Sequence, residues 1–173
     1  VDVSIIEVSS FQLELLNQIE FEIGLLLNME QDHLDRHGTF EDYKAIKEKV
    51  LKHSAFNISF NNRNSLGKDY KNYHNHELPK GFLESSTLSN WTLHDKQNLR
   101  AGIEVLNTYS KHYKSIENNK NLYEDILKSL KSFKKLPHRF EFVNQFEGVS
   151  FINDSKATNI DAMIKAVSSA NQY

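Results

Sequence analysis

The stretch IGLLLNMEQDHLDRHGTFEDYKAIKEKVLKHSAFNISF, residues 23–60, decides the fold class. It contains a short apolar strand (Ile23–Asn28), a polar loop, an amphipathic helix (about Phe40–His53) and a second apolar strand (Ala55–Phe60). Thr39 and the acid three residues after it resemble a helix-capping box. A strand, a helix and a strand in this order predict an α/β domain with a largely parallel sheet.

The preceding residues extend the same alternation towards the start of the chain. VDVSIIEV (Val1–Val8) is rich in β-branched residues and predicts a buried strand. Ser9 and Ser10 are plausible caps for a helix through FQLELLNQI (Phe11–Ile19). The sequence therefore predicts strand, helix, strand, helix, strand over its first 60 residues.

The remainder of the chain changes character twice. Residues 61–90 are polar and Asn-rich, and they predict loops with at most a short hairpin. Helical periodicity follows over residues 95–111 and 122–133. FEFV and VSFIN, within residues 140–153, then alternate as the strands of a hairpin that turns through Glu147 and Gly148.

The shift from helices to a hairpin marks a predicted domain boundary. Pro137, one of only two prolines, lies at this shift, so we expect one domain over residues 1–135 and the beginning of another over 136–173. The chain opens with Val1 directly in an apolar run and stops within a helical pattern, and we expect it to be a piece of a longer chain.

Composition limits the classes of protein. The 173 residues are 39% hydrophobic and 25% charged, which excludes collagen-like and fully disordered chains. A formal net charge of −2 gives no reason to expect nucleic acid or a membrane as partner. There are no cysteines, which excludes disulfides and thiolate chemistry. We expect a cytoplasmic protein. We also expect it to be a monomer.

Acidic and histidine side chains follow the predicted strands. Glu7 ends the first strand, and Asp32, His33 and Asp35 follow the second. Ligands of open α/β sheets bind beyond the carboxyl ends of the strands, so these side chains are candidates for binding a divalent cation. Salt bridges and helix caps are the alternative, and the residues alone leave both open.

Lys47 lies in the apolar stripe of its predicted helix. Phe40, Tyr43, Val50 and Leu51 form that stripe at helical spacing, and Lys47 falls inside it. A lysine there extends its amine to water, pairs with an acid, or loses its proton because desolvation lowers its pKa. A neutral amine can take up carbon dioxide as a carbamate, which is an oxygen ligand suited to magnesium. Extension to water remains the alternative.

INDSKATN, Ile152–Asn159, follows the last predicted strand and precedes a helix. Four polar side chains lie within five of its residues: Asp154, Ser155, Lys156 and Thr158. Backbone N–H groups at a helix start, with a lysine nearby, can bind an anion; an ordinary capping turn is the alternative. Arg139 is either a bidentate clamp for phosphate or carboxylate, or an exposed side chain at the domain boundary.

Two phosphate-binding patterns are absent from the sequence. The only Gly-Lys pair, Gly67-Lys68, lacks the glycine that the P-loop needs five residues earlier, and G-x-G-x-x-G does not occur. The H-E-x-x-H motif of a zinc helix does not occur. We expect the other histidines considered to be solvated: His37, His53, His74, His76 and His112.

Five motifs together resemble one family. They are EVSSFQLE (Glu7–Glu14), LNMEQDHLDRHG (Leu27–Gly38), YKAIK (Tyr43–Lys47), LPHRFE (Leu136–Glu141) and INDSKATN (Ile152–Asn159). Their order and approximate spacing are similar to those of the Mur ligases, and the last two most resemble the branch that adds D-glutamate.

The resemblance implies a fold and a reaction. The fold is the three-layer central domain of that family, mostly parallel sheet flanked by helices, with the start of a Rossmann-like C-terminal domain. The implied reaction is ATP- and Mg²⁺-dependent addition of D-glutamate to UDP-N-acetylmuramoyl-L-alanine through an acyl phosphate, in peptidoglycan biosynthesis. The alternatives are another amide ligase, of the muramyl-tripeptide or folylpolyglutamate type, and a non-catalytic piece. We expect the isolated 173 residues to be inactive.

The resemblance also implies roles for residues in the first 60 positions. Glu7 and His33 match magnesium-associated residues of the family, and Lys47 matches the lysine that is carbamylated in its members. His33 and Lys47 are thereby implied to be catalytic as well as metal-associated.

The later motifs imply the nucleotide and substrate contacts. Asp154 matches the acid at the nucleotide ribose, and Arg139 and Lys156 match basic residues near the phosphates, Lys156 with a catalytic role. Thr158 matches a residue at the D-glutamate site.

The adenine-contact motif departs from the family. The family pattern His-Asn-x-x-Asn here begins at His94 and ends at Asn98, with Asp95 in place of the first asparagine. A carboxylate accepts from the adenine amino group but cannot donate to the ring nitrogen. Adenine binding is then weakened or carried by Asn98, and Asp95 could instead cap the helix.

Overall fold

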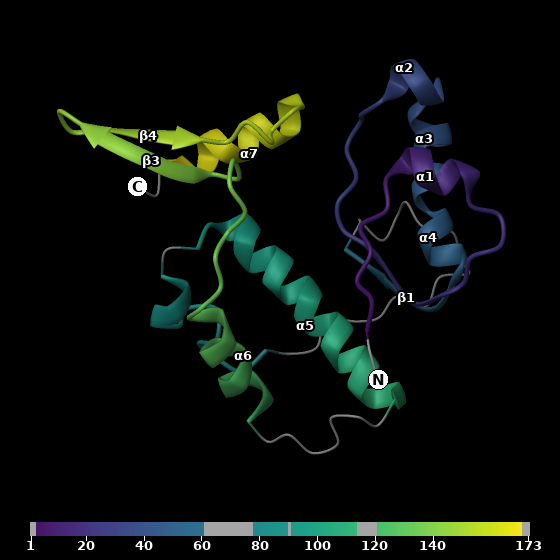
Figure 1. The fold of residues 1–173 in the computed structure, drawn as a ribbon, viewed down its shortest axis with the longest axis horizontal. Coiled ribbons are helices and arrows are strands. Elements are labelled where there is room, and N and C mark those ends of the chain that lie inside the picture. The colour runs from purple at the N-terminus through teal and green to yellow at the C-terminus, as the bar shows by residue number, and fades with distance from the viewer. Residues whose placement is uncertain (1–2, 61–77, 90, 114–120, 171–173) are drawn as a thin grey trace. The chain divides into compact units, whose positions relative to one another are not determined.

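The computed structural model describes residues 3–60, 78–89, 91–113 and 121–170 (Figure 1). The chain divides into two compact units, one of residues 1–76 and 100–117 and the other of residues 77–99 and 118–173. The predicted boundary between residues 135 and 136 stays a prediction.

The first unit contains a parallel pair of strands joined through helices. Strand β1 (Phe21–Leu26) pairs in parallel with β2 (Ser54–Ser59). The connection contains helices α3 (Phe40–Lys47) and α4 (Lys49–Lys52), and α4 contacts both strands. The predicted α/β class with parallel pairing is confirmed. The single predicted helix is divided at Glu48.

The predicted first strand is wrong. Residues 3–9 form no strand, and Ile5 is 97% exposed. Apolar alternation indicates which residues suit a sheet, but a strand exists only through hydrogen bonds to a neighbour, and this segment is in neither of the two described sheets. Helix α1 (Ser10–Leu15) follows, shorter than predicted, and Ser9 forms its N-terminal capping box with Gln12.

A small apolar core fixes the helices of this unit. Leu26, Met29, Tyr43 and Leu51 are buried together, and Phe40 and Val50 pack against them. Tyr43, Leu51, Phe40 and Val50 are the stripe residues predicted for the helix around Lys47. Leu26 at the end of β1 and Met29 in the loop after it complete the core. The stripe therefore faces the core as its spacing predicts.

The loop between β1 and α3 contains a short helix that the sequence did not indicate. Helix α2 (Leu34–His37) ends at Gly38, whose φ of 83° is typical of glycine. Thr39 then caps α3: its hydroxyl oxygen accepts the Asp42 N–H at 3.1 Å, and the hydroxyl donates to the Asp42 carboxylate at 2.6 Å.

The predicted later helices are confirmed. Helix α5 (Leu93–Tyr113) includes the whole predicted range, and α6 (Leu122–Leu130) begins where predicted and ends three residues early. Residues 61–77, where loops or a short hairpin were predicted, lie outside the described residues; a short 3₁₀ helix, η1 (Ser86–Leu88), follows at 86–88.

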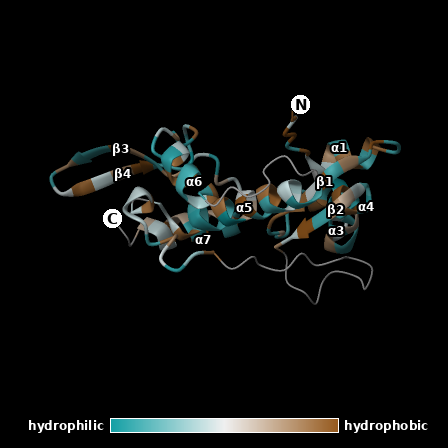
Figure 2. Ribbon diagram, turned by 90° about the horizontal axis from the view of Figure 1, so that it is seen from below, coloured by the Kyte–Doolittle hydropathy of each residue, from teal (hydrophilic) through white to brown (hydrophobic). Residues whose placement is uncertain are grey.

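The hairpin prediction is also confirmed. Strand β3 (Glu141–Phe146) pairs antiparallel with β4 (Val149–Asn153), and Glu147 and Gly148 form the turn with φ of 46° and 79°. Helix α7 (Ile160–Ala170) follows. Both strands carry exposed apolar side chains. Figure 2 colours the ribbon by the hydropathy of each residue. None of the described helices is long and apolar enough to cross a membrane.

Candidate functional site

Lys47 is the last residue of α3 and is half-buried at the edge of the core. Desolvation by burial lowers the pKa of its amine below the usual lysine value, and the negative charge of Glu7 acts in the opposite direction. The net shift is downward, so burial dominates. Of the three predicted behaviours, the structure combines a lowered amine pKa with electrostatic attraction to an acid.

His33 adopts an unusual backbone conformation just before α2. Its φ of 52° and ψ of 32° are left-handed, a region that residues other than glycine seldom occupy. The Asp32 carboxylate accepts the His33 N–H at 2.9 Å and lies 3.7 Å from its Nδ1. The imidazole meets the ring of Phe11 edge-on at 5.1 Å.

The chemistry of Glu7, His33 and Lys47 can be compared with the needs of magnesium. The described residues contain no group of three or more His, Asp or Glu side chains arranged to hold a metal ion. Magnesium retains several waters and commonly uses one or two carboxylates together with substrate phosphates. The exposed Glu7 carboxylate, whose charge acts on Lys47, fits this mode, and a dedicated protein cage is not required.

The prediction that His37 is solvated is wrong. Its side chain is 8% exposed, and its Nε2 lies 3.0 Å from the hydroxyl of Ser10, which is itself buried. Sequence reasoning missed this residue because an isolated histidine in a polar loop resembles a surface residue. The available signal was its position four residues after His33, which places both on one face of a helical turn.

The two late motifs meet at the base of the hairpin. The Asp154 carboxylate accepts the Phe140 N–H at 3.1 Å, and the His138 carbonyl accepts the Lys156 N–H at 3.2 Å. His138 and Phe140 have positive φ values of 65° and 47°, so the chain turns sharply through Arg139 between them.

Side chains of these motifs remain accessible. Arg139, Lys156 and Thr158 are exposed, and Asp154 is half-buried. Helix α7 is capped by the neighbouring residue Asn159, whose side-chain oxygen accepts the Ala162 N–H at 2.9 Å. The cap therefore uses none of the four predicted polar side chains.

The start of α5 explains the departure at Asp95. Thr92 and Asp95 form a reciprocal capping pattern: the carboxylate accepts the Thr92 N–H at 2.9 Å, and the Thr92 hydroxyl oxygen accepts the Asp95 N–H at 3.1 Å. Asp95 is thus the third residue of the helix and not its N-cap. His94 and Asn98, by contrast, are exposed.

Lys135 completes the environment of Asp95 with an ion pair of 2.6 Å. Burial would raise the pKa of the Asp95 carboxyl, but hydrogen bonds from Lys135 and Thr92 and the charge of Lys135 outweigh burial and hold it below its usual value. The carboxylate at this position is therefore kept ionised.

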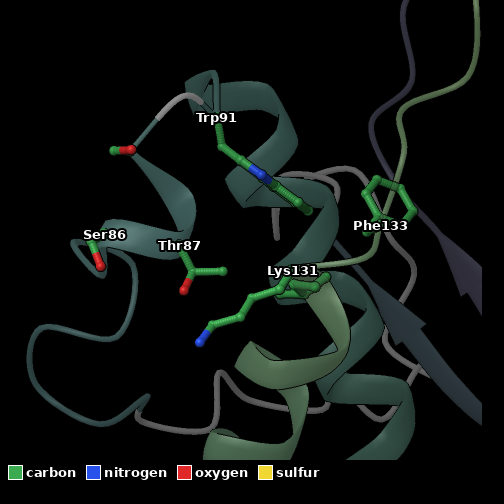
Figure 3. A pocket seen from close by; sticks show the side chains of 7 residues that line it. Ser86, Thr87, Trp91, Lys131 and Phe133 are labelled. Carbon is green, nitrogen blue, oxygen red and sulfur yellow. The ribbon is translucent and has the colours of Figure 1, made fainter.

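A pocket in the second unit contains none of the predicted site residues. Figure 3 shows Ser86 and Thr87 of η1 on one side and Lys131 after α6 on the other, with Trp91 and Phe133 nearby. The Trp91 and Phe133 rings lie 5.5 Å apart. Nothing in the sequence pattern indicated this pocket.

These features define an α/β protein with a parallel strand pair, a partly desolvated lysine that an acid influences electrostatically, and a hairpin base that exposes basic side chains. The family model of the Mur ligase middle domain matches residues 1–117. The chain belongs to the Mur ligase family, as the five motifs predict.

Individual relatives agree with this assignment. The chain is 34% identical to the UDP-N-acetylmuramoylalanine--D-glutamate ligase of Francisella philomiragia subsp. philomiragia, an alignment covering 97% of this chain and 39% of the relative. It is 33% identical to the protein of the same name from Alkaliphilus metalliredigens, covering 98% and 41%, and 34% identical to that from Koribacter versatilis, covering 96% and 41%. The chain thus spans about two fifths of the length of these relatives.

Proposed function

We propose that the full-length protein carrying these residues is an ATP-dependent ligase that adds D-glutamate to UDP-N-acetylmuramoyl-L-alanine in peptidoglycan synthesis. The observation that carries the proposal is the half-buried Lys47, with a lowered pKa beside the acid Glu7, in a chain of this family. The names of its relatives support the choice of D-glutamate.

Lys47 contributes by its neutral amine. The nitrogen lone pair attacks carbon dioxide, a C–N bond forms, and one proton is released to water, which leaves a carbamate anion. Burial favours this step because it favours the neutral amine. The carbamate, Glu7 and His33 would then hold Mg²⁺, which when bound neutralises phosphate charge.

The second unit contributes nucleotide contacts. One oxygen of Asp154 accepts the Phe140 N–H, and a carboxylate has further lone pairs with which to accept a ribose hydroxyl. The exposed Arg139 and Lys156 supply positive charge for phosphate oxygens, and Thr158 supplies a hydroxyl for D-glutamate.

The adenine contact falls to His94 and Asn98. Both side chains are exposed, whereas one Asp95 oxygen already accepts hydrogen bonds from Thr92 and Lys135. The Asn98 amide can donate to a ring nitrogen and accept from the adenine amino group, which Asp95 alone cannot do.

The proposed reaction is the one that the family resemblance implies. A carboxylate oxygen of the first substrate attacks the γ-phosphorus of ATP, ADP leaves, and an acyl phosphate forms. The amine of D-glutamate attacks the acyl carbon, a proton is lost, and the tetrahedral intermediate expels phosphate to leave the amide. Positioning and charge neutralisation by Arg139 and Lys156 lower the barrier to the first transfer.

An amino-acid panel tests the proposal. The full-length protein, ATP, Mg²⁺ and UDP-N-acetylmuramoyl-L-alanine are mixed with single amino acids, and phosphate release and product mass are measured. Release that requires D-glutamate is expected, and the isolated 173 residues serve as an inactive control. Preference for another amino acid would instead identify a different amide ligase of the family. Absence of ATP cleavage in the full-length protein would favour a non-catalytic role.

A further inference from the structure

The buried pair Ser10 and His37 joins two helices that are far apart in the sequence. The exposed fractions of the side chains are 3% and 8%, and the hydroxyl and Nε2 lie 3.0 Å apart. Ser10 begins α1 and His37 ends α2. A hydrogen bond between two desolvated groups is directional and is costly to break, because either partner alone would be buried without a replacement.

The other ring nitrogen of His37 indicates that the residue does more than fill space. Its Nδ1 is buried and has no hydrogen-bond partner among the described residues. A phenylalanine would fill the same aromatic site, between rings of Phe11 at 5.4 Å and Tyr43 at 5.5 Å, without burying an unpaired polar atom. What histidine adds is the bond to Ser10.

His37, which forms that bond, also contacts the backbone of His33. The His33 carbonyl accepts the N–H groups of both Arg36 and His37 at 3.0 Å. The His33 ring also contacts Phe11, the same ring that contacts His37. His33 occupies the left-handed region, which costs a non-glycine residue free energy and persists only when surrounding contacts fix it.

We propose that His37 is a positioning residue: through its hydrogen bond to Ser10 it holds the left-handed turn at His33 and keeps the His33 imidazole against Phe11. The purpose of the turn, which is to present His33 to a divalent metal ion, rests on the proposed function. The positioning itself rests on the contacts alone.

Amide hydrogen exchange in the 173-residue chain tests the positioning. Ser10→Ala removes only the hydroxyl, and exchange at the amides of His37 and Gly38 should accelerate about tenfold, with loss of the Phe11–His33 ring contact in proton NMR. The Leu51 amide, in the core of the same unit, should not change, because the effect is local. His37→Phe keeps an aromatic ring at this position but removes the bond to Ser10, and it should give the same acceleration.

A matched control exists on the same two helices. Arg36 pairs with Glu14 at 3.1 Å between α2 and α1, but its side chain is 53% exposed, and such pairs contribute little. Arg36→Gln should therefore change exchange at His37 and Gly38 by no more than about twofold. Equal exchange in Ser10→Ala, His37→Phe and Arg36→Gln would overturn the proposal, as would acceleration that extends equally to Leu51.

Mn²⁺ separates this proposal from the proposed function. Broadening of the His33 ring resonances by Mn²⁺ should require about tenfold more metal in Ser10→Ala than in the parent chain. Equal metal requirements would overturn the link between positioning and metal presentation. Mn²⁺ could broaden the His33 ring resonances in neither the parent chain nor Ser10→Ala, while amide exchange still accelerates in Ser10→Ala. That result would support the positioning and contradict the metal role proposed for His33.

Discussion

The surroundings of Lys47 and those of Asp154 show two ways of preparing a functional side chain. Lys47 is half-buried at the end of α3, a helix that contributes Tyr43 to the apolar core, and its pKa is lowered mainly by removal from water. Asp154 lies at the base of an exposed hairpin and is fixed by accepting a backbone N–H from Phe140. Burial lowers the pKa of the first group, whereas hydrogen bonding fixes the orientation of the second.

The difference teaches where each region is sensitive to mutation. Reactivity at Lys47 depends on packing that spans β1, α3 and α4, so distant core changes should alter it. The hairpin base depends on local backbone contacts between residues 138–141 and 153–156. Changes there should affect ligand binding with little effect on the core of the first unit.

The largest expected effect comes from removing the desolvated amine. Lys47→Ala should lower ligase activity of the full-length protein by about 10³-fold or more, since transition-state charge would lose its preorganised partner. Bicarbonate should restore part of the activity if the vacated space admits a small acid. Lys52→Ala, on the exposed side of α4, is the matched control and should keep near-normal activity. Full activity in Lys47→Ala would remove this residue from the mechanism.

The next effect tests the packing that supports Lys47. An added Cβ at Gly24 in β1 would collide with the Ser54 hydroxyl and the Val50 carbonyl. Gly24→Ala should therefore destabilise the chain by about 2–3 kcal/mol in urea unfolding, because a backbone atom must shift.

A second glycine provides the control for that change. Gly102 in α5 has no atom within 4 Å of an added Cβ. Gly102→Ala should stabilise the chain by about 0.5–1 kcal/mol through better helix propensity. Equal effects of the two substitutions would contradict the packing described around β1.

A smaller effect is expected in the second unit. Asp95→Asn removes the ion pair with Lys135 and should cost about 1 kcal/mol of stability. It also restores the amide of the family pattern, so the KM for ATP of the full-length protein should fall by about fivefold. An unchanged or raised KM would contradict the expectation that an amide at position 95 adds an adenine contact to those of His94 and Asn98.

Acid provides an internal check on the same variant. The folded-state pKa of Asp95 is below its usual value of 3.8, so its stabilising contribution is complete above that value and is lost as the pH falls through the lowered pKa. The stability difference between the parent and Asp95→Asn should shrink over that range in urea unfolding. A difference that grows with acid would contradict the ion pair.

The sequence predicted elements well where the period of apolar residues was sustained. The stripe of α3 and α4, the parallel strand pair, α5 and the hairpin turn at Glu147 and Gly148 all follow local pattern. The strand predicted over residues 3–8 was wrong because a β-branched apolar run cannot by itself supply a pairing partner. The prediction of a solvated His37 was wrong because its burial depends on a contact with Ser10 of α1, which is 27 residues earlier in the chain.

The features of the candidate site that could be predicted are likewise those that depend on local spacing. The position of Lys47 in the apolar stripe was readable from spacing, and so was its desolvation. The ion pair between Asp95 and Lys135 joins residues 40 positions apart and was not readable. Contacts of this length depend on the tertiary fold, which no local period encodes.

The pKa of Lys47 tests the central claim most directly. Lys47 can be followed by NMR titration of its side-chain nitrogen in the 173-residue chain, with Lys47→Met to assign the signal. The account predicts a pKa below the usual lysine value of 10.5, and a further fall in Glu7→Gln, because the Glu7 charge opposes the effect of burial. A pKa at or above 10.5, or a rise in Glu7→Gln, would contradict it.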